Sequence, residues 1–492
     1  MKSSSQFLNN EITNAVSLIS LVMLSFSISG SYTDLYEITM GEAYFTQGMA
    51  NNSASFDYLF RKLPYDGGYV VFAGLNDVLT ILESFHFTDD DIYFLKQLQF
   101  NNSYLEYLKQ FSFSCDVYSC MEGEVVFRHC PILRVEGNII EAQLVETMLL
   151  NILNFESLIA TKAARIKYIA GNSSLSDFGL RRAQGFGGIL ATKASVIGGF
   201  ETTSNVYGAE LYNLSATGTM AHSFIQNYDD ELEAFRAFAN TRPHDCIFLV
   251  DTYNTLKSGI PNAITVAKEM EAKGFKAKGI RLDSGDLAYL SKAARKMLDD
   301  AGLQYVKIAA SNQLDEFVIK SLQEQNAPID IFGVGTSLVT GKPDAALDGV
   351  YKLTMAANNP RLKLSESLEK TTLPGVKQVY RVFDDDGLFF GADAILLADE
   401  NEHAETIFHP FDAAKFIDVK KLKQQPLLQK VMSKGKRTSP KSSLKAIADY
   451  AKKRLALLPA EYKRFENPHI YKVSISKQLM QLRDDLRNRY KK

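Results

Sequence analysis

The chain has 492 residues, of which 46% are hydrophobic, so it can bury a large core and divide into several domains. Lysine and arginine number 55 against 57 acidic residues, and this near-neutral balance excludes the strongly basic composition typical of proteins whose main partner is nucleic acid. The four cysteines (Cys115, Cys120, Cys130 and Cys246) match no zinc-ligand spacing and indicate reduced, unreactive thiols in a cytoplasmic protein.

Residues 1–31 are predicted to be an N-terminal extension. Its apolar run "AVSLISLVMLSFSISGSY" has the length of a signal-peptide core and is too short to span a bilayer. Lys2 is the only basic residue before this run, and Glu11 interrupts the flank, so the pattern argues against export. No stretch elsewhere in the chain is expected to span a membrane, and we expect no membrane partner.

Residues 32–158 are predicted to form the first part of an α+β sandwich domain. Helical patterns such as "DLYEITMGEAYFTQ" alternate with the short β-rich runs "GGYVVFAG" and "EGEVVFRHCPILRVEG", which indicate an antiparallel sheet. The next stretch, "AQLVETMLLNILNFESLIATKAARIKYIAG", is apolar at i, i+3 and i+4 and predicts one or two long helices leading into a second domain.

Residues 159–355 are predicted to form an irregular TIM-like α/β barrel. A short apolar strand, a polar or glycine turn and an amphipathic helix recur in four units: "CIFLVDTYNT", "GIRLDSGDLAYLSKAARKML", "VKIAASNQLDEFVIKSLQEQ" and "IDIFGVGTSLVTG". Such alternation gives right-handed crossovers and a parallel sheet, either closed as a barrel or open. We favour the barrel because polar residues follow the carboxyl end of every strand, the face where barrels keep their active sites.

These strand-end residues are carboxylates, hydroxyls, an amide and glycines. They are Asp251 and Thr252, then Asp283, Ser284 and Asp286, then Ser311 and Asn312, and last Gly333, Gly335 and Thr336. Each alone is readily explained as a helix cap. Four consecutive units that supply such groups to one rim are harder to explain by capping, so the rim is the candidate site.

Three features suggest that the rim binds anions. "FGVGTS" resembles a phosphate cradle, in which glycines let backbone N–H groups approach an anion and Thr336 adds a hydroxyl. "DFGLRRAQG" offers the ring of Phe178 beside the guanidinium of Arg181, although a core phenylalanine and a solvated arginine are the plainer alternative. Arg281 lies inside the strand "GIRLD", where a charge needs a partner or an anionic ligand.

The stretch "NLSATGTMAHSFIQ" places His222 where an apolar strand is predicted to give way to a helix, facing the same rim. A lone histidine is more often structural. A neutral imidazole, however, is a competent nucleophile toward a phosphoryl group at neutral pH. If a nucleoside triphosphate and Mg²⁺ bind at the rim, His222 is a candidate for phosphorylation.

After the barrel, residues 356–410 are predicted to return to the sandwich domain through the hairpin "QVYRVFDDDGLFFGADAILLAD". Residues 411–492 are predicted to be a charged helical segment with helices near 441–455 and 475–490. The expected fold class is therefore α/β, with the barrel domain accompanied by a sandwich domain built from N-terminal and C-terminal segments.

Taken together and in order, the motifs resemble the nicotinate phosphoribosyltransferases, a family of barrel-type phosphoribosyltransferases. The resemblance runs from "YTDLYEITMGEAYF" through "FRKLPYDGGYVVFAGL", "DFGLRRAQG", "GGFETTSNVYGAELYNLSATGTMAHSF", "GIRLDSGDLA" and "FGVGTSLVTG" to "LPAEYKRFENPHIYKVSIS". It implies synthesis of nicotinate mononucleotide from nicotinate and phosphoribosyl pyrophosphate in NAD salvage, with ATP as co-substrate and Mg²⁺ as cofactor. It also implies a homodimer with a shared active site.

The resemblance assigns roles to single residues. His222 is the residue phosphorylated by ATP, and Tyr36, Phe178, Thr219 and Arg281 enclose nicotinate, with Tyr36 reaching across from the second subunit. Thr336 and Gly335 hold the 5-phosphate, and Asp251 and Asp283 lie near the ribose and the Mg²⁺–pyrophosphate, which makes Asp283 the candidate metal ligand. Ser204 aligns with an aspartate of the related nicotinamide enzyme, and a serine hydroxyl can donate to a carboxylate where an aspartate would repel it. Nicotinate is therefore favoured over nicotinamide.

Other functions fit some of the same residues. One alternative, quinolinate phosphoribosyltransferase, needs no ATP, and its dicarboxylate substrate would require more basic residues in the site. A Schiff-base barrel aldolase could use Lys307, which lies in the strand "VKIAAS", although a lysine paired with a rim carboxylate is the plainer interpretation. A non-catalytic metabolite sensor should keep its ligand when His222 is lost.

Overall fold

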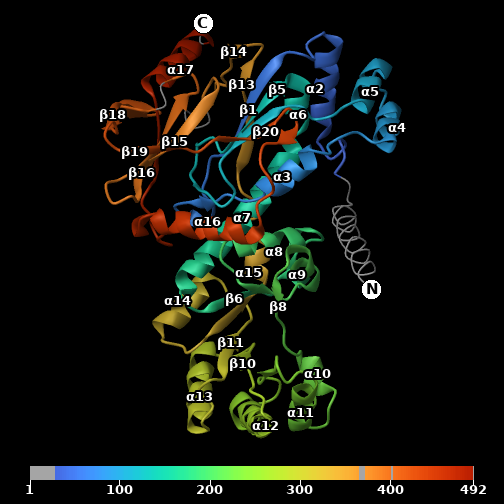
Figure 1. Ribbon diagram of the computed structural model, residues 1–492, viewed down its shortest axis with the longest axis vertical. Helices are drawn as coiled ribbons and strands as arrows, with labels where there is room; N and C mark the ends of the chain where they lie inside the picture. Colours follow the sequence, from blue (N-terminus) through green and yellow to red (C-terminus); the bar gives the residue numbers. More distant parts are fainter. Residues whose placement is uncertain (1–27, 365–371, 401–402, 491–492) are drawn as a thin grey trace, which may run out of the picture. The chain divides into compact units, whose positions relative to one another are not determined.

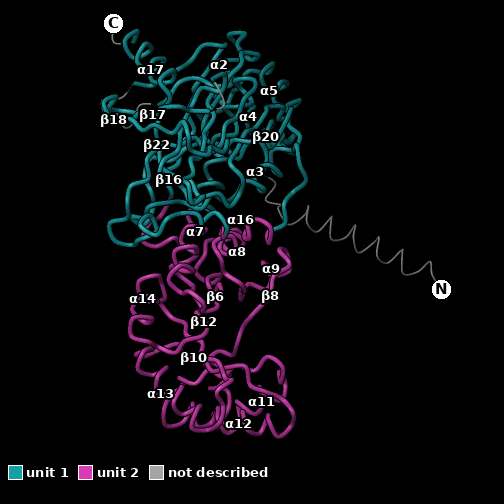
Figure 2. Tube along the Cα trace, turned by 60° about the vertical axis from the view of Figure 1, so that its left-hand side comes forward, with its two compact units in different colours: residues 1–157, 347–443, 453–492 teal, residues 158–346, 444–452 magenta. Residues whose placement is uncertain are grey.

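The computed structural model describes residues 28–364, 372–400 and 403–490. The chain divides into two compact units, which are coloured separately in Figure 2. The first unit comprises residues 1–157, 347–443 and 453–492, and the second comprises residues 158–346 and 444–452. The predicted N-terminal extension lies almost entirely outside the described residues.

The first unit contains a seven-stranded antiparallel sheet in the order β14-β13-β1-β5-β3-β20-β21, as expected from the alternating pattern of the N-terminal segment. Its strands are β1 (Ser53–Phe60), β3 (Asp116–Ser119), β5 (Leu133–Asn138), β13 (Gly349–Ala356), β14 (Asn359–Pro360), β20 (Gln429–Ser433) and β21 (Lys436–Arg437). The short strands β2 (Val70–Val71) and β4 (Val125–Val126) pair separately. The helices on this N-terminal side are α2 (Leu35–Thr46), α3 (Leu75–Leu82), α4 (Asp89–Gln97), α5 (Asn102–Lys109) and α6 (Ile139–Leu144).

A second, six-stranded sheet in this unit has the order β18-β17-β22-β16-β15-β19 (Figure 1). The predicted hairpin is its antiparallel pair of β15 (Lys377–Phe383) and β16 (Phe389–Leu397). The other strands are β17 (Thr406–His409), β18 (Asp412–Asp418), β19 (Lys423–Pro426) and β22 (Lys472–Ile475), of which β22 runs parallel to β16. Residues 411–492 therefore contain five strands (β18 to β22) beside the expected helices α16 (Leu444–Leu457) and α17 (Lys477–Tyr490), and the prediction of a purely helical segment is wrong.

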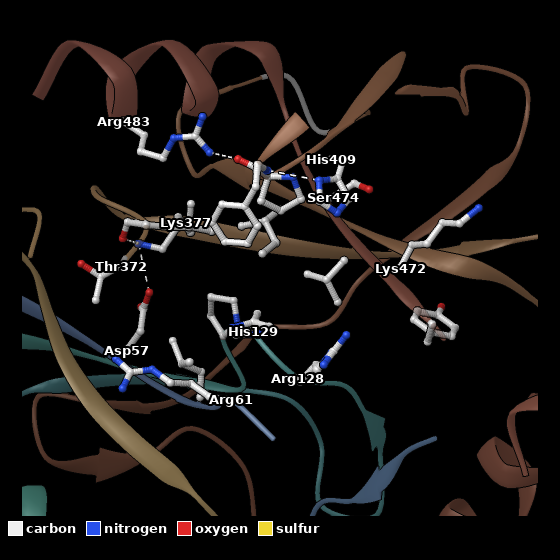
Figure 3. Close-up of a pocket in the computed structure, with 18 of the residues that line it drawn as sticks. Asp57, Arg61, Arg128, His129, Thr372, Lys377, His409, Lys472, Ser474 and Arg483 are labelled. Carbon is white, nitrogen blue, oxygen red and sulfur yellow. Dashed lines mark hydrogen bonds and ion pairs between the residues drawn. The ribbon is translucent and has the colours of Figure 1, made fainter. Parts of the chain in front are cut away.

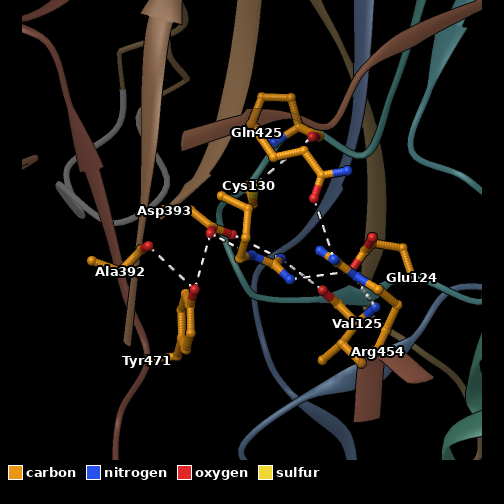
Figure 4. A network of polar contacts seen from close by, with 10 residues as sticks. Glu124, Val125, Cys130, Ala392, Asp393, Gln425, Arg454 and Tyr471 are labelled. Atoms are coloured by element: carbon orange, nitrogen blue, oxygen red, sulfur yellow. Dashed lines mark hydrogen bonds and ion pairs between the residues drawn. The ribbon is translucent and has the colours of Figure 1, made fainter. Parts of the chain in front are cut away.

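A buried polar network anchors the six-stranded sheet, and Figure 4 shows the residues around it. The guanidinium of Arg381 on β15 donates to both carboxylate oxygens of Asp393 on β16, at 2.6 and 3.0 Å. Tyr471 donates to the same carboxylate at 3.0 Å, and Glu124 accepts from Arg381 and Arg454. A fully buried charge pair with bidentate geometry holds its members in one arrangement, because leaving either charge unpaired would cost several kcal/mol (about 3–5).

The second unit is built on a seven-stranded parallel sheet in the order β8-β7-β6-β12-β11-β10-β9. Its strands are β6 (Ser174–Asp177), β7 (Thr202–Thr203), β8 (Ser215–Ala216), β9 (Ile247–Leu249), β10 (Gly279–Leu282), β11 (Lys307–Ala310) and β12 (Ile331–Val334). The first strand pairs with the last, as in a barrel, whereas β8 and β9 are the two edges. The predicted α/β alternation is confirmed, and its form is a parallel half-barrel.

Helices follow the strands of the second unit as the repeating pattern predicts. They are α8 (Gly187–Ile197), α9 (Val206–Tyr212), α10 (His222–Gln226), α11 (Glu231–Thr241), α12 (Ile260–Ala272), α13 (Leu287–Asp300), α14 (Glu316–Glu324) and α15 (Thr336–Val339). Helix α13 illustrates the cause: Asp286 caps its first turn, and Ala288, Ser291, Ala294 and Leu298 form one buried stripe. Residues at this spacing share one face of a helix, which here packs on β10 and β11.

Of the one or two long helices predicted between the sandwich and barrel segments, the structure has one, α7 (Glu146–Ala170), which the short helix α6 precedes. Within the described part of the chain, residues 139–170 are the one stretch long and apolar enough to cross a membrane, contrary to the expectation that no such stretch exists there. Of the most apolar part of this stretch, 67% is buried inside the fold, as in a core helix. Buried Arg165 of α7 donates to Glu316 of α14 at 3.0 Å, and both residues belong to the second unit.

Candidate active site

The polar strand-end residues of the second unit meet because their strands are parallel neighbours in register. Leu249 of β9 pairs with Arg281 of β10, which pairs with Ala309 of β11. Continuing each strand past its carboxyl end places Asp251, Asp283 and Ser311 side by side. The backbone N–H of Asp283 donates to the Asp251 carboxylate at 2.7 Å. The sequence prediction that these residues share one rim is thus confirmed.

His222 stands at the centre of this rim, at the first position of α10. Its Nδ1 lies 3.0 Å from the hydroxyl of Thr252, and its Nε2 lies 3.9 Å from a carboxylate oxygen of both Asp251 and Asp283. The side chain is 38% exposed, so a ligand can reach the ring. The preceding strand β8 consists of two exposed residues, so the apolar strand predicted before His222 is wrong.

The side chain of Asp251 is buried, and only one of its two carboxylate oxygens accepts hydrogen bonds. Its Oδ2 accepts from the N–H of Asp283 and from the hydroxyl of Ser284, both at 2.7 Å. Its Oδ1 has no hydrogen-bond partner among the described residues, and the side chain is 1% exposed. A buried carboxylate oxygen without a partner is costly, so the site is built to receive a donor or a cation at this oxygen.

Arg281 joins the carboxylates to the turn before His222. Its guanidinium donates to the hydroxyl of Thr219 and lies 3.8 Å from the carboxylate of Asp283, which also accepts from Ser311. Burial lowers the pKa of Arg281, and the nearby charge of Arg181 lowers it further, against the opposing effect of the carboxylates. The Nε of Arg281 has no partner among the described residues, so the guanidinium retains donor capacity for an anion.

The ring of Phe178 lies against the glycines of "FGVGTS". A Cβ on Gly333 would come within 2.5 Å of the Phe178 ring, and one on Gly335 would come within 3.1 Å of its carbonyl oxygen. These glycines therefore let β12 and the turn after it approach Phe178 closely. Gly335 caps the short helix α15, which begins at Thr336.

Comparison with known proteins decides the family. Sequence models of the nicotinate phosphoribosyltransferase N-terminal domain, family and C-terminal domain match residues 32–154, 173–387 and 376–483. The nicotinate phosphoribosyltransferase of Bacillus subtilis is 44% identical over 454 residues, covering 90% of this chain and 92% of that protein. The chain belongs to the nicotinate phosphoribosyltransferase family. It is accordingly an enzyme.

Two further nicotinate phosphoribosyltransferases span the chain. The protein of Dictyostelium discoideum is 38% identical over 510 residues, covering 91% of this chain and 86% of that protein. The crystal structure of human nicotinic acid phosphoribosyltransferase matches with a TM-score of 0.84 and 31% identity, covering 92% of this chain and 99% of that one. The mixed α/β fold with its parallel half-barrel is thus a fold of this family.

Not every predicted site residue joins the cluster around His222. Ser204 is exposed at the end of β7, where its N–H donates to the carbonyl of Asp177 at 2.8 Å. Asn312 follows β11 with a left-handed backbone (φ 81°). Tyr36 is 45% exposed on α2 and belongs to the first unit.

The aldolase alternative finds no support in the position of Lys307. This lysine is the first residue of β11, at the amino end of the strand, whereas the candidate site lies beyond the carboxyl ends. Its side chain is 58% exposed and pairs with Asp330 at 2.9 Å. A Schiff-base lysine needs a sheltered amine beside the substrate, and Lys307 is instead a paired lysine. Its partner Asp330 directly precedes β12 and is therefore not a rim carboxylate, as the plainer interpretation had expected.

Two supporting residues were not assigned to the site from the sequence. Thr252 was noted only as a strand-end residue, yet it holds the ring of His222. Asp177 was missed altogether: its buried carboxylate accepts from the N–H of Gly179 at 2.8 Å and from the hydroxyls of Thr192 and Thr203 at 2.7 and 2.9 Å. A carboxylate at the last position of a strand, directly before "FGLRR", was the signal available.

Proposed function

We propose that this enzyme converts nicotinate, phosphoribosyl pyrophosphate, ATP and water into nicotinate mononucleotide, ADP, phosphate and pyrophosphate, in NAD salvage. The observation that carries the proposal is the position of His222, whose ring is exposed at the rim between two carboxylates and a threonine hydroxyl. In the tautomer whose Nδ1–H donates to the hydroxyl of Thr252, the lone pair is on Nε2. This nitrogen would take the γ-phosphoryl group as ADP leaves, and water would later release it as phosphate.

Nicotinate would bind through an aromatic face and a guanidinium. The free donor capacity of Arg281 suits the carboxylate of the substrate, since charge-assisted hydrogen bonds are among the strongest available to a protein. Phe178 would stack on the pyridine ring, Thr219 would fix the arginine, and Arg181 would add positive charge. Tyr36 would complete the site from the second subunit of a homodimer, a role that suits its exposure.

Phosphoribosyl pyrophosphate would lie along the same rim. Gly335 and Thr336 would hold the 5-phosphate, and Ser311 and Asn312 would face the sugar and the pyrophosphate. At the anomeric carbon, nicotinate would displace pyrophosphate, and the carboxylate of Asp251 would stabilise the positive charge that develops on the ribose.

The residues present fit a Mg²⁺ ion bound together with substrate. No group of three or more histidine, cysteine, aspartate or glutamate side chains in the described part of the chain could hold a metal ion by itself. Asp283 is partly exposed and the Oδ1 of Asp251 lacks a partner, and Mg²⁺ in phosphoryl-binding sites is held by one or two carboxylates plus phosphate oxygens. Bound there, the ion would neutralise charge on the pyrophosphate leaving group.

The test is a product assay on the purified enzyme. Nicotinate mononucleotide, ADP and phosphate should all form from nicotinate, phosphoribosyl pyrophosphate and ATP, and omission of ATP should reduce the rate. Quinolinate or nicotinamide in place of nicotinate should give little product. Faster conversion of either alternative substrate would contradict the proposal.

Ser204→Asp should shift the preference from nicotinate toward nicotinamide. An added carboxylate would repel that of nicotinate and accept from an amide, and we expect the ratio of kcat/KM values to fall by about tenfold, or about 1.4 kcal/mol. The neutral Ser204→Asn variant is the matched control and should change the ratio less. An unchanged ratio in Ser204→Asp would refute the role of this position in specificity.

We also propose a cytoplasmic location. All four cysteines are free and buried, as expected for a protein of a reducing compartment.

A further inference from the structure

The first unit contains a cavity of about 490 Å³, whose lining is shown in Figure 3. Strands β1 and β13 of the seven-stranded sheet bound it on one side, and β16, β22 and the hairpin of β17 and β18 bound it on the other. The volume lies within the range of small-molecule sites, about 300–1,000 Å³. No residue of the candidate active site lines this cavity, so the proposed catalysis does not account for it.

The charged side chains that line the cavity are mostly basic. Asp57 is the single carboxylate among its described lining residues, and it is already paired with Lys377 at 3.0 Å. Arg483 does not contact Asp57; it pairs with Asp484 at 2.8 Å and donates to the carbonyl of Pro410. Lys415 of the lining is likewise paired, with Asp412 at 3.1 Å.

Three further cations of the lining have side chains without a hydrogen bond or ion pair to another described residue. They are Arg128 and Lys472, whose side chains are exposed, and Lys352, which is half-buried and interacts electrostatically with Glu146. Burial lowers the pKa of Lys352, the charge of Glu146 opposes this shift, and the neighbouring charges of Arg61 and Lys363 add to it. Cations gathered in this way repel one another, and a bound anion would relieve that repulsion.

Exposed apolar side chains line the same cavity. Phe411, Phe416 and Ile470 are 39%, 64% and 64% exposed. Large apolar groups exposed together commonly mark a ligand-binding groove. Phenyl rings offer faces on which a heteroaromatic base can stack, while arginine and lysine bind phosphate.

We propose that this cavity is a second, non-catalytic site that binds a nucleoside phosphate. The base would lie against Phe411 and Phe416, and the phosphates would contact Arg128, Lys352 and Lys472. A free inorganic anion would use only the cationic part of the cavity, and a purely apolar ligand would leave the cations unpaired. The combination of the two linings therefore selects a ligand with both an aromatic and a phosphate part.

The experiment is calorimetric titration of the full-length enzyme with ADP, compared with the Arg128→Glu/Lys472→Glu variant. Both side chains are exposed, so the substitutions should not disturb folding. The wild type should show two classes of ADP site, and the variant should lose one, with affinity reduced by about tenfold or more, the worth of one charge-assisted hydrogen bond. Phe416→Ser should weaken ADP and leave inorganic pyrophosphate unchanged.

The control is Lys420→Glu/Lys445→Glu, which makes the same change in net charge at exposed lysines outside the cavity and should bind ADP as the wild type does. An unchanged ADP isotherm in Arg128→Glu/Lys472→Glu would overturn the proposal. So would equal binding of pyrophosphate and ADP with no effect of Phe416→Ser, because the site would then be a general anion site. Rates without added ADP should be unchanged in the cavity variants, so failure here is distinguishable from failure of the catalytic proposal.

Discussion

Incubation with γ-labelled ATP is expected to place acid-labile label on the wild-type enzyme and none on the His222→Ala variant. The reason is geometric: Thr252 holds one ring nitrogen of His222, and the other is directed into a rim that a nucleotide can reach. Removal of the imidazole should also abolish the stimulation by ATP and reduce kcat by about 100-fold or more, the usual worth of a positioned nucleophile or base.

The matched control is His244→Ala. His244 is exposed in the same unit, before β9, and therefore lies at the amino end of the sheet. This variant should take up label as the wild type does. Labelling of His222→Ala at the wild-type level would eliminate the proposed phosphohistidine.

Arg281→Met is expected to raise the KM for nicotinate by about 100-fold, while the KM for ATP changes little. Methionine preserves much of the volume of the side chain and removes the charge. A buried hydrogen bond between charged groups is worth about 1.5–3 kcal/mol, which corresponds to this range of affinities. Arg281→Lys should recover only part of the loss, because an ammonium group cannot bind a carboxylate through two parallel N–H groups.

Steady-state kinetics with nicotinate as the varied substrate provide the measurement. Arg242→Met, at a side chain that is 62% exposed in the same unit, should leave both KM values unchanged. If Arg281→Met lowers kcat alone and leaves the KM for nicotinate as it was, Arg281 does not bind the substrate. Loss of the folded state would be recognised by circular dichroism.

Some strands could not be predicted, because they form only through hydrogen bonds to a neighbouring strand and their own sequences show no strand pattern. Strands β18 and β19 are mostly exposed edge strands, and "DAAKFID" and "KQQP" carry little apolar alternation. They are strands because their backbones pair with β17 and β15. The prediction of a charged helical segment for residues 411–492 did not take this pairing into account. Thr252 was likewise visible in the sequence, but its role depends on a neighbouring strand end.

The sequence by itself determined the alternation of strand and helix in the second unit. It also determined that Asp251, Asp283 and Ser311 follow neighbouring strands, since parallel strands in register bring their carboxyl ends to one edge. Only the tertiary structure decided that the sheet is open between β8 and β9 and that Nε2 of His222 faces two carboxylates. Only it decided that cations and phenyl rings from distant segments line one cavity in the first unit. Contacts across a sheet or between sheets depend on register and side-chain direction, which local periodicity does not encode.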